Sequence, residues 1–196
     1  MENLYLLRHG ETELNVKKVY YGSTDCALTA QGEADADKLR AVFAEIPVQL
    51  CFVSPLKRAV DTAVRIFPQR EEAFLRRDEN LRELDFGAWE GKHYSELEAD
   101  PHWQKWAADY FHVAPPGGES FLALSHRVCV FKETLFAREE QHIAIVGHHG
   151  ALTLLMALLL EMPPEKCWHF TFHHGAYTHF SIADAYPVLR GHNLKS

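Results

Sequence analysis

The sequence has few cysteines, no long apolar run and no repeated or low-complexity tract. Its four cysteines, at positions 26, 51, 129 and 167, form no CxxC pair, which argues against a disulfide framework and favours a reducing compartment. The most apolar run, Ala151 to Leu160, is too short to cross a bilayer and is expected to form a buried helix. The N-terminus lacks the basic and apolar stretches of a signal peptide. These absences predict a cytoplasmic protein with no membrane partner.

An excess of positive charge is also missing. The formal net charge is −7 and no basic stripe is visible, so no nucleic-acid partner is expected. The chain does have apolar residues, which make up 47% of its 196 positions and can form one sizeable core. These values predict a single domain spanning residues 1–196. Nothing in the sequence indicates an oligomeric state.

Strand and helix patterns alternate along the chain. Thr29 and Ser54 are expected to cap two helices, with Pro55 opening the second, and Ser120 is expected to cap a third. Residues 84–116 are aromatic and irregular, which predicts short helices or a long excursion over one end of a sheet. The fold class expected is α/β, a three-layer sandwich in which helices flank a largely parallel central sheet. Strands are predicted at Asn3–Arg8, Leu50–Ser54 and His142–Gly147, and more weakly at Trp168–Phe172, Tyr177–Ile182 and Val188–His192.

Cationic or titratable side chains follow each of the three strands that the sequence predicts most clearly. Arg8 and His9 end the first strand, Arg58 lies in the opening turn of the next helix, and His148 follows the third strand. Ligands of open α/β sheets bind at the carboxyl ends of the strands, where helix N-termini add positive charge. Arginine suits phosphate because its guanidinium binds two oxygens at once. The pattern indicates an oxyanion pocket, although spacing alone leaves open unrelated surface arginines and structural histidines.

Five motifs, in order, resemble a known family. "LLRHGETELN", "GSTDCALTAQG", "SPLKRA", "LRELDFGAWEG" and "VGHHGAL" are similar to the motifs of the histidine phosphatase superfamily, in its phosphoglycerate-mutase-like branch. The resemblance covers nearly the whole chain. It implies the phosphoglycerate-mutase-like fold and a phosphatase that uses a phosphohistidine intermediate.

The resemblance also implies roles for individual residues. His9 would be the nucleophile and Glu83 the proton donor, although without the resemblance Glu83 reads as a surface carboxylate paired with Arg82. The family has a second active-site histidine that, with Arg8 and Arg58, would hold the transferring phosphoryl group. In "VGHHG" this role is given to His148, which directly follows Gly147, and His149 is expected to point elsewhere. The substrate-binding set implied by the resemblance is Arg8, Asn15, Tyr21, Gly22, Arg58 and His148.

The chemistry of these residues suggests a mechanism that needs no metal and no cofactor. A neutral imidazole can attack phosphorus if its other nitrogen donates to a backbone carbonyl, so we expect this of His9. Phosphoryl transfer then needs positioning and charge neutralisation, which Arg8, Arg58 and a cationic His148 would supply. A neighbouring phosphate dianion favours the protonated form of Glu83, which would act first as acid and then as base.

The expected substrate is a small phosphorylated metabolite. Within the superfamily, "KVYYGSTDCALT" and "MPPEKCWHFTFHHGAYTHFSI" resemble the α-ribazole phosphatases, which remove a 5′-phosphate during assembly of the cobalamin nucleotide loop. A broad-specificity sugar-phosphate phosphatase or a phosphoglycerate-mutase-like enzyme is the alternative, though the compact 84–116 segment favours hydrolysis. Its aromatic residues could stack on a benzimidazole base or simply pack the segment onto the domain.

Histidine is abundant, with 13 residues, so a metal-binding protein is a more distant alternative. The pairs His148-His149 and His173-His174 suggest it. Adjacent residues in an extended strand point to opposite faces, however, so His173 and His174 could not easily bind one ion. The familiar zinc-ligand spacings are missing as well.

Overall fold

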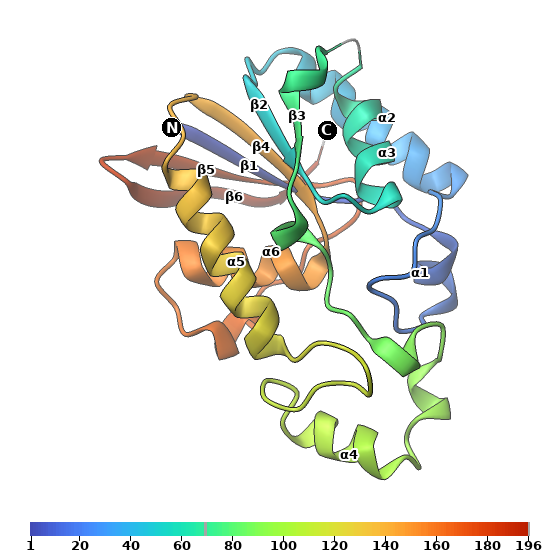
Figure 1. Ribbon diagram of the computed structural model, residues 1–196. Helices are drawn as coiled ribbons and strands as arrows, with labels where there is room; N and C mark the ends of the chain where they lie inside the picture. The colour runs from blue at the N-terminus through green and yellow to red at the C-terminus, as the bar shows by residue number, and fades with distance from the viewer. Residues whose placement is uncertain (69, 196) are drawn as a thin grey trace.

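A central sheet of six strands organises the computed structural model, which describes residues 1–68 and 70–195 (Figure 1). The strand order is β3-β2-β4-β1-β5-β6, with β3, β2, β4 and β1 parallel and β5 and β6 antiparallel. The largely parallel sheet predicted from the sequence is therefore confirmed. The strands are β1 (Asn3–Arg8), β2 (Leu50–Val53), β3 (Leu75–Arg77), β4 (His142–Gly147), β5 (Tyr177–Ala183) and β6 (Tyr186–Leu194).

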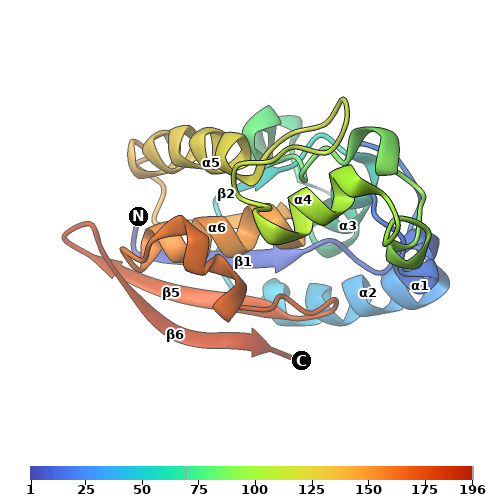
Figure 2. The ribbon, with the colours of Figure 1, turned by 90° about the horizontal axis from the view of Figure 1, so that it is seen from below.

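Helices cover both faces of the sheet, which makes the three layers (Figures 1 and 2). Alternate residues of β1 point to opposite faces, so Leu4 and Leu6 pack into the core under α5 and α6, while Tyr5 and Leu7 pack into the core with α2 and α3. The helices are α1 (Glu13–Lys17), α2 (Ala30–Ala44), α3 (Lys57–Ile66), α4 (Pro101–Ala108), α5 (Phe121–Phe136) and α6 (His149–Leu159).

Two of the three predicted helix caps are confirmed. The Thr29 side chain accepts a hydrogen bond from the third helical N–H of α2, and Ser120 does the same for α5. The prediction for Ser54 and Pro55 was wrong, because α3 begins at Lys57 after Leu56, whose side chain makes no capping bond. The Ser54 hydroxyl accepts from the Leu56 N–H at 3.4 Å, before the helix begins, and it contacts the imidazole of His148 at 2.7 Å.

The predicted strand at Trp168–Phe172 was also wrong. A 3₁₀ helix, η5 (Pro164–His169), follows α6, with Pro163 and Pro164 at its start. Proline fixes φ near −65° and lacks an N–H, which suits the first turn of a helix better than the middle of a sheet. The polypeptide then continues without regular structure to β5.

Residues 84–116 do form short helices, η3 (Gly87–Trp89), η4 (Tyr94–Glu96) and α4, and Figure 1 shows them projecting beyond one end of the sheet. Trp89 is only 1% exposed and lies edge-on to Trp106, with ring centroids 5.5 Å apart. Tyr20, from the segment after α1, packs on the same cluster. These aromatic side chains therefore pack the segment onto the rest of the chain. The remaining 3₁₀ helices are η1 (Glu72–Phe74) and η2 (Glu79–Leu81).

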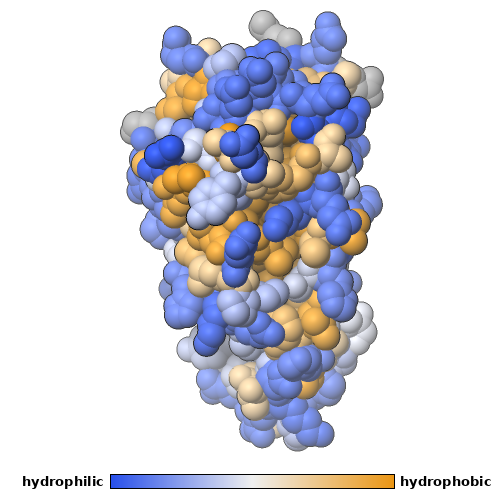
Figure 3. Space-filling model, turned by 90° about the vertical axis from the view of Figure 1, so that its left-hand side faces the viewer, coloured by the Kyte–Doolittle hydropathy of each residue, from blue (hydrophilic) through white to orange (hydrophobic). Residues whose placement is uncertain are grey.

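Apolar side chains also reach the surface. Figure 3 shows apolar and polar residues interspersed on one side of the molecule, with the broadest apolar area near its middle. Val130 of α5 and Tyr186 of β6 are among the exposed apolar side chains of the protein. Within residues 1–68 and 70–195, no helix has the length and apolar character needed to cross a membrane.

Candidate active site

The carboxyl ends of β1 and β4 lie side by side, and this places two histidines together. Arg8 is in register with Gly147, and the backbone N–H of His9 donates to the Gly147 carbonyl at 2.9 Å. The next residue along each strand is therefore a histidine at the same edge of the sheet. The rings of His9 and His148 have their centroids 5.1 Å apart.

The imidazole of His9 is buried and its tautomer is set by the backbone. Its Nδ1 lies 2.7 Å from the Gly10 carbonyl oxygen, which can only accept a hydrogen bond. Nδ1 therefore carries the proton, and Nε2 presents a lone pair. Burial above all, and then the neighbouring charges of Arg8 and Arg58, hold the pKa of His9 well below its ordinary value. A neutral ring with one exposed lone pair is the nucleophilic form of histidine.

Arg58 is fully buried in the first turn of α3. Its Nη2 donates to the Gly22 carbonyl at 2.7 Å and its Nη1 to the Thr24 carbonyl at 2.9 Å. Its Nε donates to Nδ1 of His148 at 3.2 Å. Three acceptors thus orient the guanidinium, and it also lies over the ring of Tyr21, 4.7 Å from the centroid.

His148 is neutral in this geometry, so the expected cationic imidazole was wrong. Its Nδ1 must be unprotonated because Arg58 Nε can only donate, and its Nε2 therefore donates to the Ser54 hydroxyl. Burial and the neighbouring Arg58 and Arg8 charges hold the pKa of His148 well below its usual value. His149 packs on the ring of Trp168, 5.6 Å away.

Arg8 and Asn15 extend the polar surface around His9. Arg8 Nη1 donates to the Phe172 carbonyl at 2.9 Å, while its Nε is buried with no hydrogen-bond partner among the described residues. The Asn15 amide oxygen accepts from the Thr12 N–H and hydroxyl in a capping box at the start of α1. Because the capping box uses the oxygen, the Nδ2 group of Asn15 is the one able to donate to a phosphate.

Tyr21 and Gly22 are placed to support Arg58. The Tyr21 ring is buried with its hydroxyl 2.9 Å from the Thr12 hydroxyl, and the Gly22 N–H donates to Glu90 at 2.7 Å. Both backbone groups of Gly22 are therefore used within the protein. Direct contact with a substrate stays a prediction for these two residues.

Glu83 lies at the N-terminus of α6, close to His148. Its Oε2 accepts from the Gly150 N–H and its Oε1 from the Leu84 N–H, both at 3.0 Å. The positive end of the helix dipole favours a carboxylate at this position. The alternative pairing with Arg82 is not what the structure shows, because Arg82 lies 3.4 Å from Glu79.

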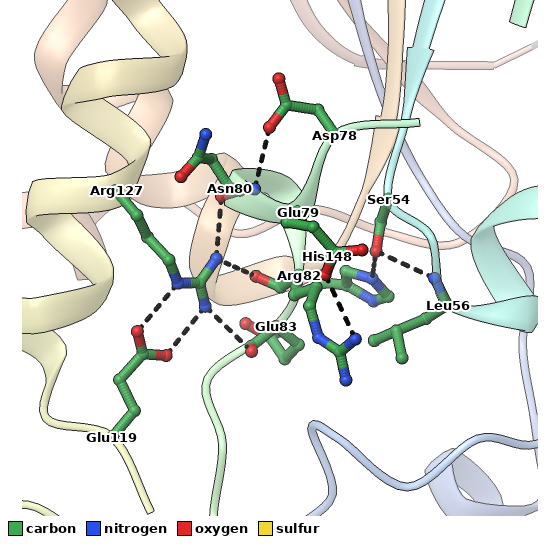
Figure 4. A network of polar contacts seen from close by, with 10 residues as sticks. All are labelled: Ser54, Leu56, Asp78, Glu79, Asn80, Arg82, Glu83, Glu119, Arg127 and His148. Carbon is green, nitrogen blue, oxygen red and sulfur yellow. Dashed lines mark hydrogen bonds and ion pairs between the residues drawn. The ribbon is translucent and has the colours of Figure 1, made fainter. Parts of the chain in front are cut away.

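The backbone that carries Glu83 is held by Arg127 of α5 (Figure 4). Arg127 donates to the carbonyls of Asn80, Arg82 and Glu83 at 2.8, 2.7 and 3.0 Å. Its Nε and Nη2 also bind the two oxygens of Glu119, each at 2.8 Å. A bidentate pair of this kind is geometrically specific, so it fixes the direction from which Glu83 reaches α6.

Three residues of this region were not identified from the sequence: Arg127, Glu90 and His174. His174 Nδ1 donates to the His9 carbonyl at 2.7 Å, and the two rings have centroids 5.4 Å apart. Burial, followed by the nearby Arg8 charge, lowers the pKa of His174 to about 4. Glu90 lies in the "LRELDFGAWEG" motif and His174 in the His173-His174 pair, but the groups that they bind are distant in the sequence, so the sequence did not reveal these contacts.

The structure thus gathers Arg8, His9, Arg58, Glu83 and His148 at the carboxyl edge of the sheet. A neutral imidazole beside two guanidinium groups and a carboxylate can transfer a phosphoryl group and a proton. In the part of the chain that the structure describes, no three His, Cys, Asp or Glu side chains are grouped so that they could hold a metal ion.

Comparisons with known proteins agree with this geometry. The chain is 35% identical to an adenosylcobalamin/alpha-ribazole phosphatase of Escherichia coli, over 98% of this chain and 96% of the relative. It superposes on the crystal structure of an alpha-ribazole phosphatase from Shigella flexneri with a TM-score of 0.93 at 35% identity, covering 98% of this chain and 96% of the other. A 2,3-bisphosphoglycerate-dependent phosphoglycerate mutase of Cytophaga hutchinsonii is 30% identical over 90% of this chain and 85% of the mutase. Residues 4–195 match the family model, and the chain belongs to the histidine phosphatase superfamily, branch 1.

Proposed function

We propose that this phosphatase removes the 5′-phosphate of α-ribazole phosphate through a phosphohistidine intermediate on His9. The observation that carries the mechanism is the His9 imidazole, whose Nδ1 is bound to the Gly10 carbonyl while its Nε2 keeps a lone pair. The substrate is inferred from relatives at about a third identity over nearly the full chain, whose names specify alpha-ribazole phosphatase.

In the first step the Nε2 lone pair of His9 attacks phosphorus while the bond to the ester oxygen breaks. Arg8 and Arg58 neutralise the equatorial oxygens, and Glu83, whose protonated form is favoured once the phosphate dianion is bound, gives its proton to the departing alkoxide. In the second step water attacks phosphohistidine and passes a proton to Glu83. Inorganic phosphate leaves, and both His9 and Glu83 return to their starting states.

His148 acts in this scheme through Arg58. As a neutral ring it accepts from Arg58 Nε and donates to Ser54, so it holds the guanidinium in place. Because Arg58 Nε donates to Nδ1, the ring stays neutral while it plays this part, and the positive charge of the site comes from Arg8 and Arg58.

We also infer that residues 1–196 act as one domain and that the protein works in the cytoplasm. Both core clusters lie on the faces of one sheet, which supports the first inference. All four cysteines have free thiols, which supports a reducing compartment.

A substrate panel tests the substrate assignment. The purified protein, assayed with a metal chelator present, should hydrolyse α-ribazole 5′-phosphate with a kcat/KM at least about tenfold above phosphoserine, sugar phosphates and 3-phosphoglycerate. A preference for sugar phosphates, or mutase activity on 3-phosphoglycerate, would replace the assignment by the corresponding alternative. Loss of activity on chelation would favour a metal-dependent enzyme.

A trapping experiment tests the intermediate. Brief reaction with ³²P-labelled substrate should leave acid-labile, base-stable label on the protein. His9→Ala should abolish the label and lower kcat by at least about a thousandfold, whereas His173→Ala, an exposed neighbour of His174, should change neither. Label retained in His9→Ala would disprove the nucleophile.

A further inference from the structure

The carboxylate of Glu90 is surrounded by four backbone N–H groups. Its Oε1 accepts from Gly22, Ser23 and Phe86 at 2.7, 3.1 and 3.1 Å, and its Oε2 accepts from Thr24 at 3.0 Å. Hydrogen bonds to a charged acceptor are about twice as strong as neutral ones. Glu90 therefore ties together two segments, residues 22–24 and residue 86, that are far apart in the sequence.

The other side of the same turn holds Arg58. The N–H groups of Gly22 and Thr24 point to Glu90, while the carbonyls of these two residues accept from Arg58 Nη2 and Nη1. The turn is thus placed between a carboxylate and a guanidinium. Its peptide groups are polarised in the direction that strengthens both sets of bonds.

The turn also lies against the segment that carries Glu83. A Cβ built on Gly22 would sit 1.6 Å from the Leu84 carbonyl oxygen, so glycine alone permits this approach. Phe86, whose N–H binds Glu90, lies three residues after Glu83. One carboxylate therefore fixes the geometry between the arginine and the acid of the site.

We propose that Glu90 is a positioning residue that aims the Arg58 guanidinium at the phosphoryl group by fixing the turn at residues 22–24. The proposal rests on the phosphate-binding role given to Arg58 above. It assigns Glu90 no contact with substrate. Its removal should therefore weaken phosphate binding through Arg58.

The test compares Glu90→Gln with Glu98→Gln, an exposed glutamate of the same segment. A glutamine oxygen can replace Oε1, but the amide nitrogen would face the Thr24 N–H, so that one donor meets another. Glu90→Gln should raise the inhibition constant of inorganic phosphate and the KM about tenfold, with a smaller change in kcat, while Glu98→Gln matches the wild type. Glu90→Asp, which keeps the charge with a shorter reach, should fall between them.

A double-mutant cycle separates positioning from general stability. In an Arg58→Ala background, Glu90→Gln should no longer change the phosphate inhibition constant, because the residue it positions is gone. Equal effects in both backgrounds, or no effect of Glu90→Gln in the wild type, would overturn the proposal while leaving the phosphatase assignment intact. Should Glu90→Gln fail to fold, the same cycle is run with Glu90→Asp, with the same two outcomes. Failure of the function itself would show instead as missing label on His9 in the wild type.

Discussion

The two central histidines carry their protons on different nitrogens, and this divides their roles. His9 donates from Nδ1 to the Gly10 carbonyl, whereas His148 accepts at Nδ1 from Arg58. One ring can therefore attack phosphorus, while the other orients a guanidinium. Both assignments follow from partners that can only accept or only donate.

Glu83 offers a test of the proton-transfer step. Glu83→Gln keeps the shape of the side chain but cannot protonate the leaving alkoxide, so kcat for an alkyl phosphate should fall about 10²- to 10⁴-fold. Hydrolysis of p-nitrophenyl phosphate should suffer far less in its first step, because nitrophenolate leaves without a proton. Rapid-quench measurement of phosphoenzyme formation with both substrates checks this. Equal losses would point to a role in positioning.

His174 should make stability depend on pH. Its pKa is lowered to about 4 by burial and then by Arg8, with Asp35 acting in the opposite direction. Between pH 4 and about 6.5 the unfolded chain binds more protons, so the free energy of unfolding rises with pH. This contribution is complete above about pH 6.5 and is lost as the pH falls toward 4.

Replacing the titrating ring isolates this contribution. His174→Gln keeps a donor for the His9 carbonyl but has no proton to take up, so its stability should decline less on acidification. Urea unfolding at pH 7.5, 6.0 and 5.0 measures the difference between the two slopes. His148, whose pKa is also lowered, remains in both proteins and contributes equally to both slopes. His174 is one of the groups that lower the pKa of His9, so the measured difference between the slopes includes the change in His9 as well. Parallel curves would show that His174 does not titrate as described.

At the scale of elements, the first turn of α6 affects both the stability of the helix and the position of the catalytic carboxylate. Gly150 donates its N–H to Glu83, and a Cβ at this position would lie 2.6 Å from Glu83 Oε1. Gly150→Ala should displace the carboxylate and lower kcat about tenfold or more. Alanine also favours the helix by up to about 1 kcal/mol, but the displaced carboxylate no longer binds the N–H of residue 150, so the two effects offset each other and the melting temperature should change little. Unchanged kcat would show that the position of Glu83 is not critical.

Local patterns predicted the elements that bury a continuous run and end at a polar residue. β1, β2 and β4 are of this kind. The polar residues that follow such strands also allowed the grouping of Arg8, His9, Arg58 and His148 at one edge of the sheet to be predicted. β3 was missed because it has three residues, two of them exposed arginines. Ser54 was wrongly predicted as a helix cap because α3 begins only at Lys57, and its contact with His148, 94 positions away, could not be predicted from the local sequence.

The residues that were missed share the same cause. Glu90 and Arg127 bind backbone groups from other parts of the chain. Since nearly every residue has the same backbone groups, the sequence does not indicate which of them a side chain will bind. His174 was recognised only as half of a histidine pair, and its contact with the His9 carbonyl depends on the irregular segment after η5. Through-space partners of this type require the three-dimensional structure.

For the whole molecule, burial predicts an order of local stability. The inner residues of β1 and β4 and most of α6 are fully buried, whereas residues 84–116 and β6 contain many exposed positions. Hydrogen exchange should therefore be slowest in β1, β4 and α6 and faster in the 84–116 segment and β6. Mass spectrometry of peptides from a deuterium-exchange series measures this. Slow exchange throughout 84–116 would show that the segment opens only with the rest of the protein.

The strand order has a consequence for synthesis on the ribosome. β1 and β2 leave the exit tunnel early, yet they are not neighbours in the sheet, because β4 lies between them. A nascent chain that has not reached His142 holds His9, Arg58 and Glu83 without the strand that joins them. Phosphatase activity should therefore appear only late in synthesis and in a single step, when β4 inserts between β2 and β1.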